Sequence, residues 1–316
     1  MASWVAAIDG GGTKTAAALA GRRGGVSFLP EGPGCNPQDG PGWAGVLRAI
    51  LTRALQAPGG VDAVVLGLPG FGEVPVHDAA VLGLLGELLK VPFEPMNDVF
   101  LAHLGGLGGG SGVLVLSGTG SMAVARGPLG MVRVGGWGDV LGDEGSAGWI
   151  GREALTLAAR AMDGRAPQAL PFARALCARL GPEAGGPFAP LTWLMAQPGT
   201  PRSAVASAAR HVDALAEEGQ GEALRLLRAA AGELALAART AALGAGLEEG
   251  FPWTEAGGAF RSHLLRAALA ETLGRPPEPP RLTTLAGGLL RAAELAGWSL
   301  DAHWAAQVDA QLRAWA

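Results

Sequence analysis

The chain has 316 residues, of which 49% are hydrophobic and 16% are charged, so it can bury a sizeable core and is not disordered. Its formal net charge of -4 argues against a dedicated nucleic-acid surface, which needs clustered positive charge, and against a polybasic membrane-surface protein. The two cysteines, Cys35 and Cys177, lie far apart and exclude a disulfide framework or a multi-cysteine zinc site.

Targeting signals are not evident in the sequence. No uninterrupted apolar run approaches the ~18 residues of a membrane span. The N-terminus lacks the basic region of a signal peptide. We therefore expect a cytoplasmic protein with no membrane and no nucleic-acid partner.

The first half of the chain alternates strands with short helices. Residues 4–8 and 16–20 are apolar runs of strand length on either side of a glycine-rich turn, so we expect a hairpin rather than a strand–helix unit. Further along we expect a helix over 42–55, a strand over 61–68, a helix over 81–89, a short strand over 91–96 and a helix beginning near Asn97 or Asp98.

The second half repeats the opening pattern and then becomes helical. Residues 105–112 are almost all glycine and mark the best domain boundary. Strands over 113–117 and 122–125 then flank a second glycine turn. Helices are expected over 147–162, 171–180, 201–217, 221–247 and 262–273, and two closing helices follow a proline-rich joint at 276–280. The pattern predicts an α/β fold in two halves, the second rich in helix.

The first glycine turn, residues 9–15, reads Asp-Gly-Gly-Gly-Thr-Lys-Thr. Its exposed N–H groups, the Thr13 hydroxyl and the Lys14 ammonium are able to surround phosphate oxygens, and Asp9 is able to hold a Mg²⁺ ion, usually through water. It is not a Walker A loop, because Thr13 rather than glycine precedes Lys14. The alternative is a tight hairpin turn with a solvated lysine.

The second glycine turn, residues 117–121, reads Ser-Gly-Thr-Gly-Ser. It loosely matches the dinucleotide fingerprint, but that fingerprint requires a helix next, whereas a hairpin is favoured here. A Rossmann dehydrogenase is therefore disfavoured. Two phosphate-type turns, one in each half, favour a nucleotide clamped between two lobes.

Two further segments carry acidic residues beside turns. Asn97 and Asp98 follow a strand and precede a helix, where they are either a helix cap or a catalytic carboxylate. Residues 135–148 place acids among glycines, which is either a flexible loop capped by Ser146 or a carbohydrate site with Trp137 for stacking. No H-E-x-x-H spacing and no G-x-S-x-G nucleophile elbow occurs.

In this order, these motifs resemble the N-acetylglucosamine kinase branch of the BadF/BadG/BcrA/BcrD ATPase family, within the actin-like sugar-kinase superfamily. The resemblance spans roughly residues 4–290. It implies two ribonuclease-H-like lobes with ATP and Mg²⁺ in the cleft. The lobes are expected over 1–108 and 109–289, with helical additions in the second, and residues 290–316 are expected to form closing helices that pack back on the first lobe.

The resemblance also implies a role for individual residues. Asp98 would be the general base on the sugar hydroxyl, and Asp9 would organise the metal. The phosphate contacts would be Gly11, Gly12, Thr13 and Lys14 in the first turn and Thr119, Gly120 and Ser121 in the second. The sugar contacts would be Asn36, Gly136, Trp137 and Asp143, and Gly257 and Gly258 would bind adenosine. We therefore predict an ATP-dependent kinase of N-acetylglucosamine or a related hexose, and we expect a homodimer.

Two segments depart from the family pattern. Residues 251–255 lack the β-branched strand that usually precedes the adenosine turn. Residues 68–72 lack the serine that N-acetylglucosamine kinases present near that point, which leaves recognition of the N-acetyl group open.

Two other functions remain as alternatives. One is an ATPase activator of a dehydratase or reductase, the other branch of the family, which shares an iron–sulfur cluster across a dimer. Cys35 and Cys177 do not have a cluster-like spacing. The other is a non-catalytic sugar sensor. The sugar, the phosphorylated hydroxyl and the oligomeric state stay open.

Overall fold

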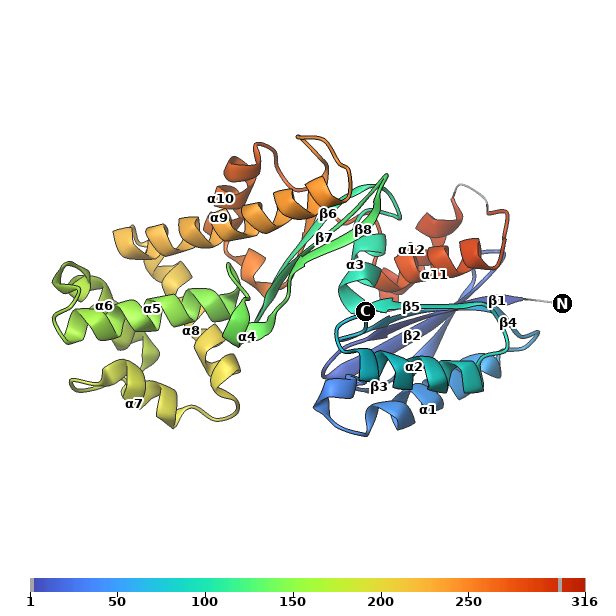
Figure 1. The fold of residues 1–316 in the computed structure, drawn as a ribbon, viewed down its shortest axis with the longest axis horizontal. Coiled ribbons are helices and arrows are strands. Elements are labelled where there is room, and N and C mark those ends of the chain that lie inside the picture. Colours follow the sequence, from blue (N-terminus) through green and yellow to red (C-terminus); the bar gives the residue numbers. More distant parts are fainter. Residues whose placement is uncertain (1–2, 301–302, 316) are drawn as a thin grey trace. The chain divides into compact units, whose positions relative to one another are not determined.

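The structure, a computed structural model, describes residues 3–300 and 303–315 (Figure 1). The chain divides into two compact units. Unit 1 combines the residues up to Gly110 with those from Pro279 onward, and unit 2 runs from Ser111 to Glu278. No helix in the described part of the chain has both the length and the apolarity needed to cross a membrane.

Unit 1 is built on a five-stranded sheet of order β3-β2-β1-β4-β5. The strands are β1 (Trp4–Gly10), β2 (Lys14–Gly21), β3 (Val26–Pro33), β4 (Val61–Leu68) and β5 (Phe93–Asn97). The first three strands form an antiparallel meander, and β4 and β5 run parallel to β1. The carboxyl ends of β1, β4 and β5 therefore meet at one edge of the sheet, where ligands bind in open α/β sheets.

Helices cover both faces of this sheet (Figure 1). One layer contains α1 (Trp43–Leu55) and α2 (Pro75–Leu88), and the other contains α3 (Asp98–Gly106), α11 (Thr284–Leu295) and α12 (Trp304–Trp315). Alternate side chains of β1 point to the two helical layers. Ala6 and Ile8 pack with α1 and α2, whereas Val5 and Ala7 pack with α11 and α12. Burial on both faces fixes the register of β1, and with it the position of Asp9.

Unit 2 repeats the meander in a four-stranded sheet of order β8-β7-β6-β9. Its strands are β6 (Gly112–Ser117), β7 (Ser121–Gly127), β8 (Gly130–Gly135) and β9 (Trp253–Ala256), with β9 parallel to β6. Its helices are α4 (Gly138–Leu141), α5 (Ala147–Met162), α6 (Leu170–Leu180), α7 (Ala189–Ala196), α8 (Pro201–Glu217), α9 (Gly221–Gly244) and α10 (His263–Leu273). Short 3₁₀ turns lie at Pro37–Asp39, Pro167–Ala169 and Gly258–Arg261.

An alanine-rich core allows the helices of unit 2 to approach one another closely. Where α5 crosses α8, a Cβ on Gly151 would lie 1.9 Å from the Val205 carbonyl oxygen. Only glycine permits this crossing, because any side chain would overlap the backbone of α8.

The structure corrects several expectations from the sequence. Residues 253–256 form strand β9 although they lack a β-branched run, because Trp253 is fully buried and the segment pairs with β6. Strands β3 and β8 and helix α7 were not expected. Helix α2 begins at Pro75 rather than near residue 81, and α9 ends at Gly244 rather than at residue 247.

The boundary between the units also differs from the expected one. Unit 2 ends at Glu278 rather than at residue 289, because Arg281 and Leu282 donate backbone hydrogen bonds to the Gly106 and Gly105 carbonyls. Helix α11 then packs on α3, where a Cβ on Gly287 would lie 2.3 Å from the Gly105 nitrogen. Gly105 is thus a helix-packing residue and not part of a flexible joint.

Candidate active site

The first glycine turn joins β1 to β2 and is closed by a hydrogen bond from the Gly11 N–H to the Lys14 carbonyl at 2.9 Å. Gly12, Thr13 and Lys14 are exposed. Lys14 Nζ lies 3.0 Å from Glu31 Oε1 on β3, and both side chains are largely exposed. Such a surface ion pair is weak, so the lysine can exchange Glu31 for an anionic ligand.

Two carboxylates lie at the carboxyl edge of the sheet of unit 1, Asp9 on β1 and Asp98 directly after β5. Burial, and after it the negative charge of Asp98, raise the pKa of Asp9 to about 7, although the positive charge of Lys14 opposes the shift. The two acids are therefore near enough to repel each other.

This pair fits a magnesium ion. Mg²⁺ prefers oxygen ligands and is usually bound by one or two carboxylates, with waters and phosphate oxygens completing its shell. A cation at Asp9 would favour its ionised form and so offset both the burial and the repulsion by Asp98 that raise the pKa of this acid. The described residues contain no group of three or more His, Cys, Asp or Glu able to hold a metal, so a bound nucleotide would have to supply further ligands.

Local hydrogen bonds fix the direction of Asp98. Asn97 caps α3 by accepting the Val99 N–H at 3.1 Å, and its amide donates to the Phe71 carbonyl at 3.3 Å. Asp98 Oδ1 also accepts the Val99 N–H, at 2.9 Å. A carboxylate in the first turn of a helix is stabilised by the helix dipole. Asp98 is therefore both a helix-terminal residue and a candidate base.

The segment that carries Asn36 packs directly on the first glycine turn. The Cys35 N–H donates to the Gly11 carbonyl at 3.1 Å, and a Cβ on Gly34 would lie 2.1 Å from the Gly12 carbonyl oxygen. Burial raises the pKa of the Cys35 thiol, and the nearby charges of the two acids raise it further. The structure thus brings the Asn36 segment, the first turn and both acids together within unit 1.

The second glycine turn, in unit 2, is anchored on the loop before α5. The Ser117 hydroxyl donates to the Gly145 carbonyl at 3.0 Å, and the Ser121 hydroxyl donates to the Glu144 carbonyl at 2.7 Å. Backbone bonds from the first turn of α5 to the turn add to this anchoring. These contacts hold the turn in one conformation before any ligand binds.

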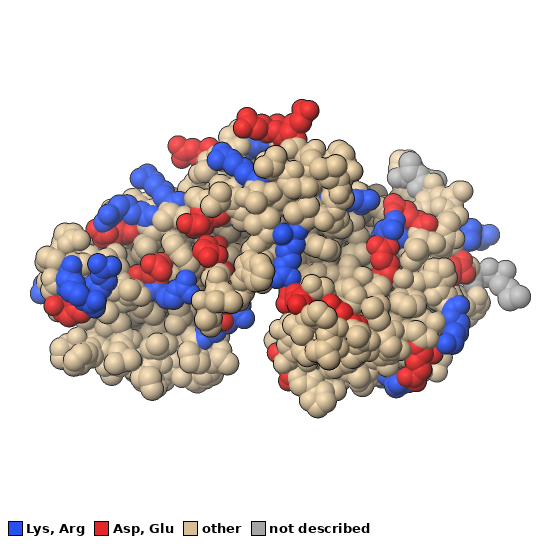
Figure 2. Space-filling view, in the orientation of Figure 1, with Lys and Arg blue, Asp and Glu red and all other residues tan. Residues whose placement is uncertain are grey.

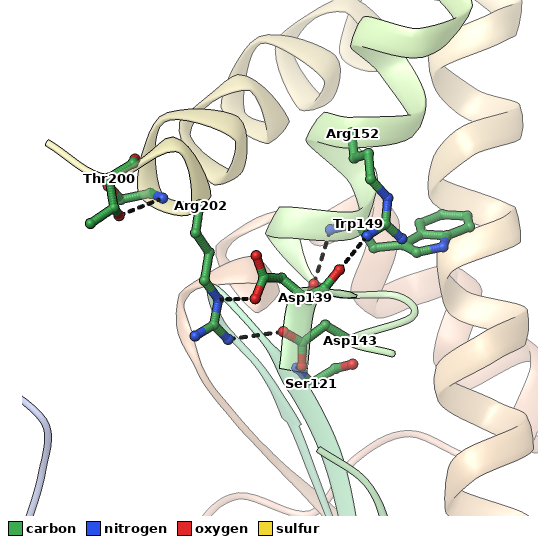
Figure 3. A network of polar contacts seen from close by, with 9 residues as sticks. Ser121, Asp139, Asp143, Trp149, Arg152, Thr200 and Arg202 are labelled. Atoms are coloured by element: carbon green, nitrogen blue, oxygen red, sulfur yellow. Dashed lines mark hydrogen bonds and ion pairs between the residues drawn. The ribbon is translucent and has the colours of Figure 1, made fainter. Parts of the chain in front are cut away.

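Asp143 completes the anchoring (Figure 3). One of its carboxylate oxygens accepts the Ser121 N–H at 3.2 Å, and the other accepts a hydrogen bond from Arg202 at 2.9 Å. Asp143 is 4% exposed and has a φ of 61°, the only positive φ of a non-glycine residue in the described chain. Trp137, in contrast, is 72% exposed, and its indole is free to stack on a ligand.

A cavity of about 620 Å³ opens beside the second glycine turn in unit 2. Gly118 and Thr119 of that turn line it together with Gly258. Its size falls in the usual range for small-ligand sites. The remaining walls come from the apolar residues Ala147, Ile150, Ala206, Ala209, Leu227, Ala259 and Leu265 and the polar residues Ser203, Ser207, Arg210, Asp213, Arg261 and Ser262.

The turn that the sequence predicts to bind adenosine reaches this cavity because Gly257 packs against the second glycine turn. Its φ is 103°, and a Cβ there would lie 2.2 Å from the Ser117 carbonyl oxygen. Gly258, the next residue, lines the cavity, whereas Gly257 does not. The two glycines therefore have different tasks, close packing for Gly257 and cavity lining for Gly258.

Comparison with known families settles the relationship of the chain. Residues 7–276 match the sequence profile of the BadF/BadG/BcrA/BcrD ATPase family. The chain belongs to this family. The resemblance found in the sequence motifs is thus confirmed.

Individual relatives of this BadF/BadG/BcrA/BcrD ATPase family member are sugar kinases by description. The N-acetylmuramic acid/N-acetylglucosamine kinase of Clostridium acetobutylicum is 40% identical over 85 residues, which are 27% of this chain and 26% of that protein. The match thus spans about a quarter of the curated relative. A solved structure from Chromobacterium violaceum, described as a candidate N-acetylglucosamine kinase, has a TM-score of 0.66 at 28% identity and covers 93% of this chain and 98% of its own.

More distant structures share the fold. A candidate N-acetylglucosamine kinase from Porphyromonas gingivalis has a TM-score of 0.61 at 20% identity and covers 92% of this chain and 98% of its own. A ROK hexokinase from Thermus thermophilus has a TM-score of 0.54 at 18% identity and covers 92% of this chain and 99% of its own. The predicted α/β fold with two actin-like lobes is confirmed.

The sequence did not reveal several residues that lie at the second glycine turn and the cavity of unit 2. Arg202 contacts Asp143, Arg152 donates to the Asp139 carbonyl at 2.7 Å, and Asp213 lines the cavity of unit 2. All three lie in ordinary amphipathic helices, where an exposed charge is the normal surface pattern. Figure 2 shows how such charges of both signs are mixed over the face drawn.

Proposed function

We propose that this protein transfers the γ-phosphoryl group of Mg-ATP to a hydroxyl of N-acetylglucosamine or a related amino hexose. The observation that carries the proposal is the pair of repelling carboxylates, Asp9 and Asp98, at the strand ends beside the first glycine turn. Phosphoryl transfer of this kind uses one acid to hold the metal ion and a second to accept the proton of the acceptor alcohol. The rest of the catalysis comes from positioning the phosphate groups and neutralising their charge.

In this proposal the two acids have separate roles. Asp98 accepts the proton of the sugar hydroxyl, and its bond to the Val99 N–H keeps the carboxylate in one direction. Asp9 holds Mg²⁺, which when bound neutralises charge on the phosphate oxygens. Gly11, Gly12, Thr13 and Lys14 contact the same phosphates from the first turn.

The nucleotide is assigned to the cavity of unit 2. Thr119, which lines the cavity, and Gly120 beside it bind phosphate oxygens, and the adenosine lies beside Gly258 against the apolar walls. Ser121 supports the turn instead, because its N–H and its hydroxyl already donate to acceptors within unit 2. Among the polar wall residues, Asp213 accepts a hydrogen bond from Ser262, and its carboxylate is suited to ribose hydroxyls.

The sugar is assigned to Asn36, Gly136, Trp137 and Asp143. Carboxylate and amide groups hold sugar hydroxyls, and the exposed Trp137 ring supplies a stacking face. The family relatives described as kinases of N-acetylated amino sugars support this choice of substrate class.

The activator function receives less support. Cys35 is 1% exposed and Cys177 is 6% exposed, and they lie in different units. Buried thiols are poor ligands for a cluster shared across a dimer, which has to lie at the surface where two subunits meet. The homodimer and the cytoplasmic location stay predictions, which light scattering and cell fractionation would test.

The experiment is ADP release from Mg-ATP with N-acetylglucosamine, N-acetylmannosamine, N-acetylmuramate, glucosamine and glucose. At least one amino sugar should stimulate turnover, and Asp98→Asn should lower kcat by about 100- to 10,000-fold while ATP binding is retained. Asp163→Asn, at an exposed ion pair of unit 2, serves as the control with unchanged turnover. Turnover that no sugar changes, or a fully active Asp98→Asn protein, would refute the proposal.

A further inference from the structure

The carboxylate of Asp143 is the centre of a network that joins three segments of unit 2 (Figure 3). Arg202, near the start of α8, places one guanidinium nitrogen 2.9 Å from Asp143 Oδ2 and another 3.8 Å from Asp139 Oδ1. The opposite oxygen of Asp143 accepts the Ser121 N–H at 3.2 Å. One acid therefore connects α8 to the second glycine turn.

The ion pair lies directly on the backbone of that turn. A Cβ on Gly120 would lie 2.6 Å from Asp143 Oδ1 and 2.9 Å from the Arg202 guanidinium. A side chain at residue 120 would displace the ends of these two side chains, because they occupy the space beside the turn. A movement of Asp143 therefore releases both space beside Gly120 and the hydrogen bond to the Ser121 N–H, whereas a movement of Arg202 releases the ion pair that holds Asp143 in place.

The conformation of Asp143 shows that its surroundings hold it firmly. A positive φ is uncommon for a residue with a side chain, although Asp adopts it more readily than most, and at Asp143 the contacts of the buried carboxylate on both sides stabilise it. The Asp143 side chain is 5% exposed, and the Arg202 side chain is 45% exposed. Arg202 is thus the accessible, exchangeable member of a pair whose acid is buried.

Helix α8 extends the network to the nucleotide cavity. Ser203, the residue after Arg202, lines the cavity, as does Ser207 one turn later. The N-cap Thr200 accepts the Ser203 N–H, which fixes this first helical turn. The same turn of helix therefore carries the partner of Asp143 and part of the cavity wall.

We propose that Arg202 is a positioning residue that couples sugar binding to nucleotide binding through Asp143. It holds the carboxylate so that one oxygen orders the Ser121 N–H of the second glycine turn, and a sugar hydroxyl at the same carboxylate strengthens this order. The inference rests on the proposed function, which assigns the sugar to Asp143 and phosphate to the turn. Coupling of this kind is reciprocal, so each ligand tightens the other.

The test measures binding of the non-hydrolysable analogue AMP-PNP with Mg²⁺ by calorimetry, with and without a saturating concentration of the sugar that gives the highest turnover. In the wild type we expect the sugar to tighten AMP-PNP by at least about fivefold. The coupling ratio is the AMP-PNP affinity with sugar divided by the affinity without it. In Arg202→Met this ratio should fall to within about twofold of one, and the KM for the sugar should rise by roughly tenfold to a hundredfold. Arg202→Lys, which keeps the charge but loses the planar fork, should give an intermediate ratio.

Arg165→Met provides the matched control. It removes the arginine of another Arg–Asp pair, but both partners there are exposed, so the ratio should stay at the wild-type value. A purely structural role of Arg202 would lower the melting temperature and leave the ratio unchanged. If Arg202→Met does not fold, Arg202→Lys decides the question by its own ratio.

The outcomes separate the inference from the function on which it rests. A wild type without sugar-dependent turnover overturns the proposed function and, with it, this coupling. An active wild type whose AMP-PNP affinity does not respond to sugar overturns the coupling alone. So does an active Arg202→Met or Arg202→Lys variant with the wild-type ratio.

Discussion

Asp9 should destabilise the protein in the absence of metal and nucleotide. Burial and the neighbouring Asp98 raise the pKa of Asp9 from 3.8 to about 7. An acid whose pKa is raised on folding contributes most to stability below its unfolded pKa, and this contribution is lost as the pH rises through the folded value. The loss therefore develops between about pH 4 and pH 7. At higher pH the ionised carboxylate opposes folding.

The size of the effect follows from the two pKa values. A change from 3.8 to about 7 corresponds to about 4 kcal/mol of unfolding free energy, at ~1.4 kcal/mol for each factor of ten. The side chain is partly exposed, so we expect about 2–4 kcal/mol. Asp9→Asn should be more stable than the wild type by this amount at about pH 8.5, and the gap should narrow as the pH is lowered toward 4.

Urea unfolding followed by circular dichroism, in the presence of a chelator, measures this gap across the pH range. The variant should lose kinase turnover while it gains stability, as expected where a functional site is strained. Asp163→Asn is the control: a hydrogen bond from Arg165 lowers the pKa of Asp163, so this substitution should not raise stability at high pH. An Asp9→Asn protein that is no more stable than the wild type at about pH 8.5 would contradict the reasoning.

Two pairs of glycines give further predictions. Gly257→Ala should destabilise the protein by at least about 2 kcal/mol and weaken ATP binding, because its Cβ would overlap a backbone carbonyl and its φ is positive. Gly258→Ala should unfold like the wild type, because its Cβ would have no atom within 4 Å. Gly151→Ala should lower stability by about 1–3 kcal/mol at the crossing of α5 and α8, whereas Gly232→Ala, exposed in α9, should raise it by up to about 1 kcal/mol. Thermal melts of the four variants decide both comparisons, and equal melting temperatures within a pair would refute the packing argument.

The local chemistry of the sequence determined the hairpins and the turns. Apolar runs on either side of glycines predicted the β1–β2 and β6–β7 hairpins, since strand and turn preferences act between near neighbours. The same locality placed Asp98 at the start of α3 directly after β5, and Ser146 at the cap of α5. The duplicated motif also predicted two lobes, which the family fold confirms.

The tertiary structure decided the contacts between distant segments. Strand β9 forms because Trp253 is fully buried and the segment pairs with β6, although the segment lacks the β-branched run that would have marked it as a strand in the sequence. Arg202 meets Asp143 across 59 residues, and no local pattern marks an exposed helical arginine as the partner of one particular acid. Such pairs form only when the packing of α8 and the loop before α5 brings them together, because hydrogen bonds and ion pairs depend on distances that sequence spacing does not set.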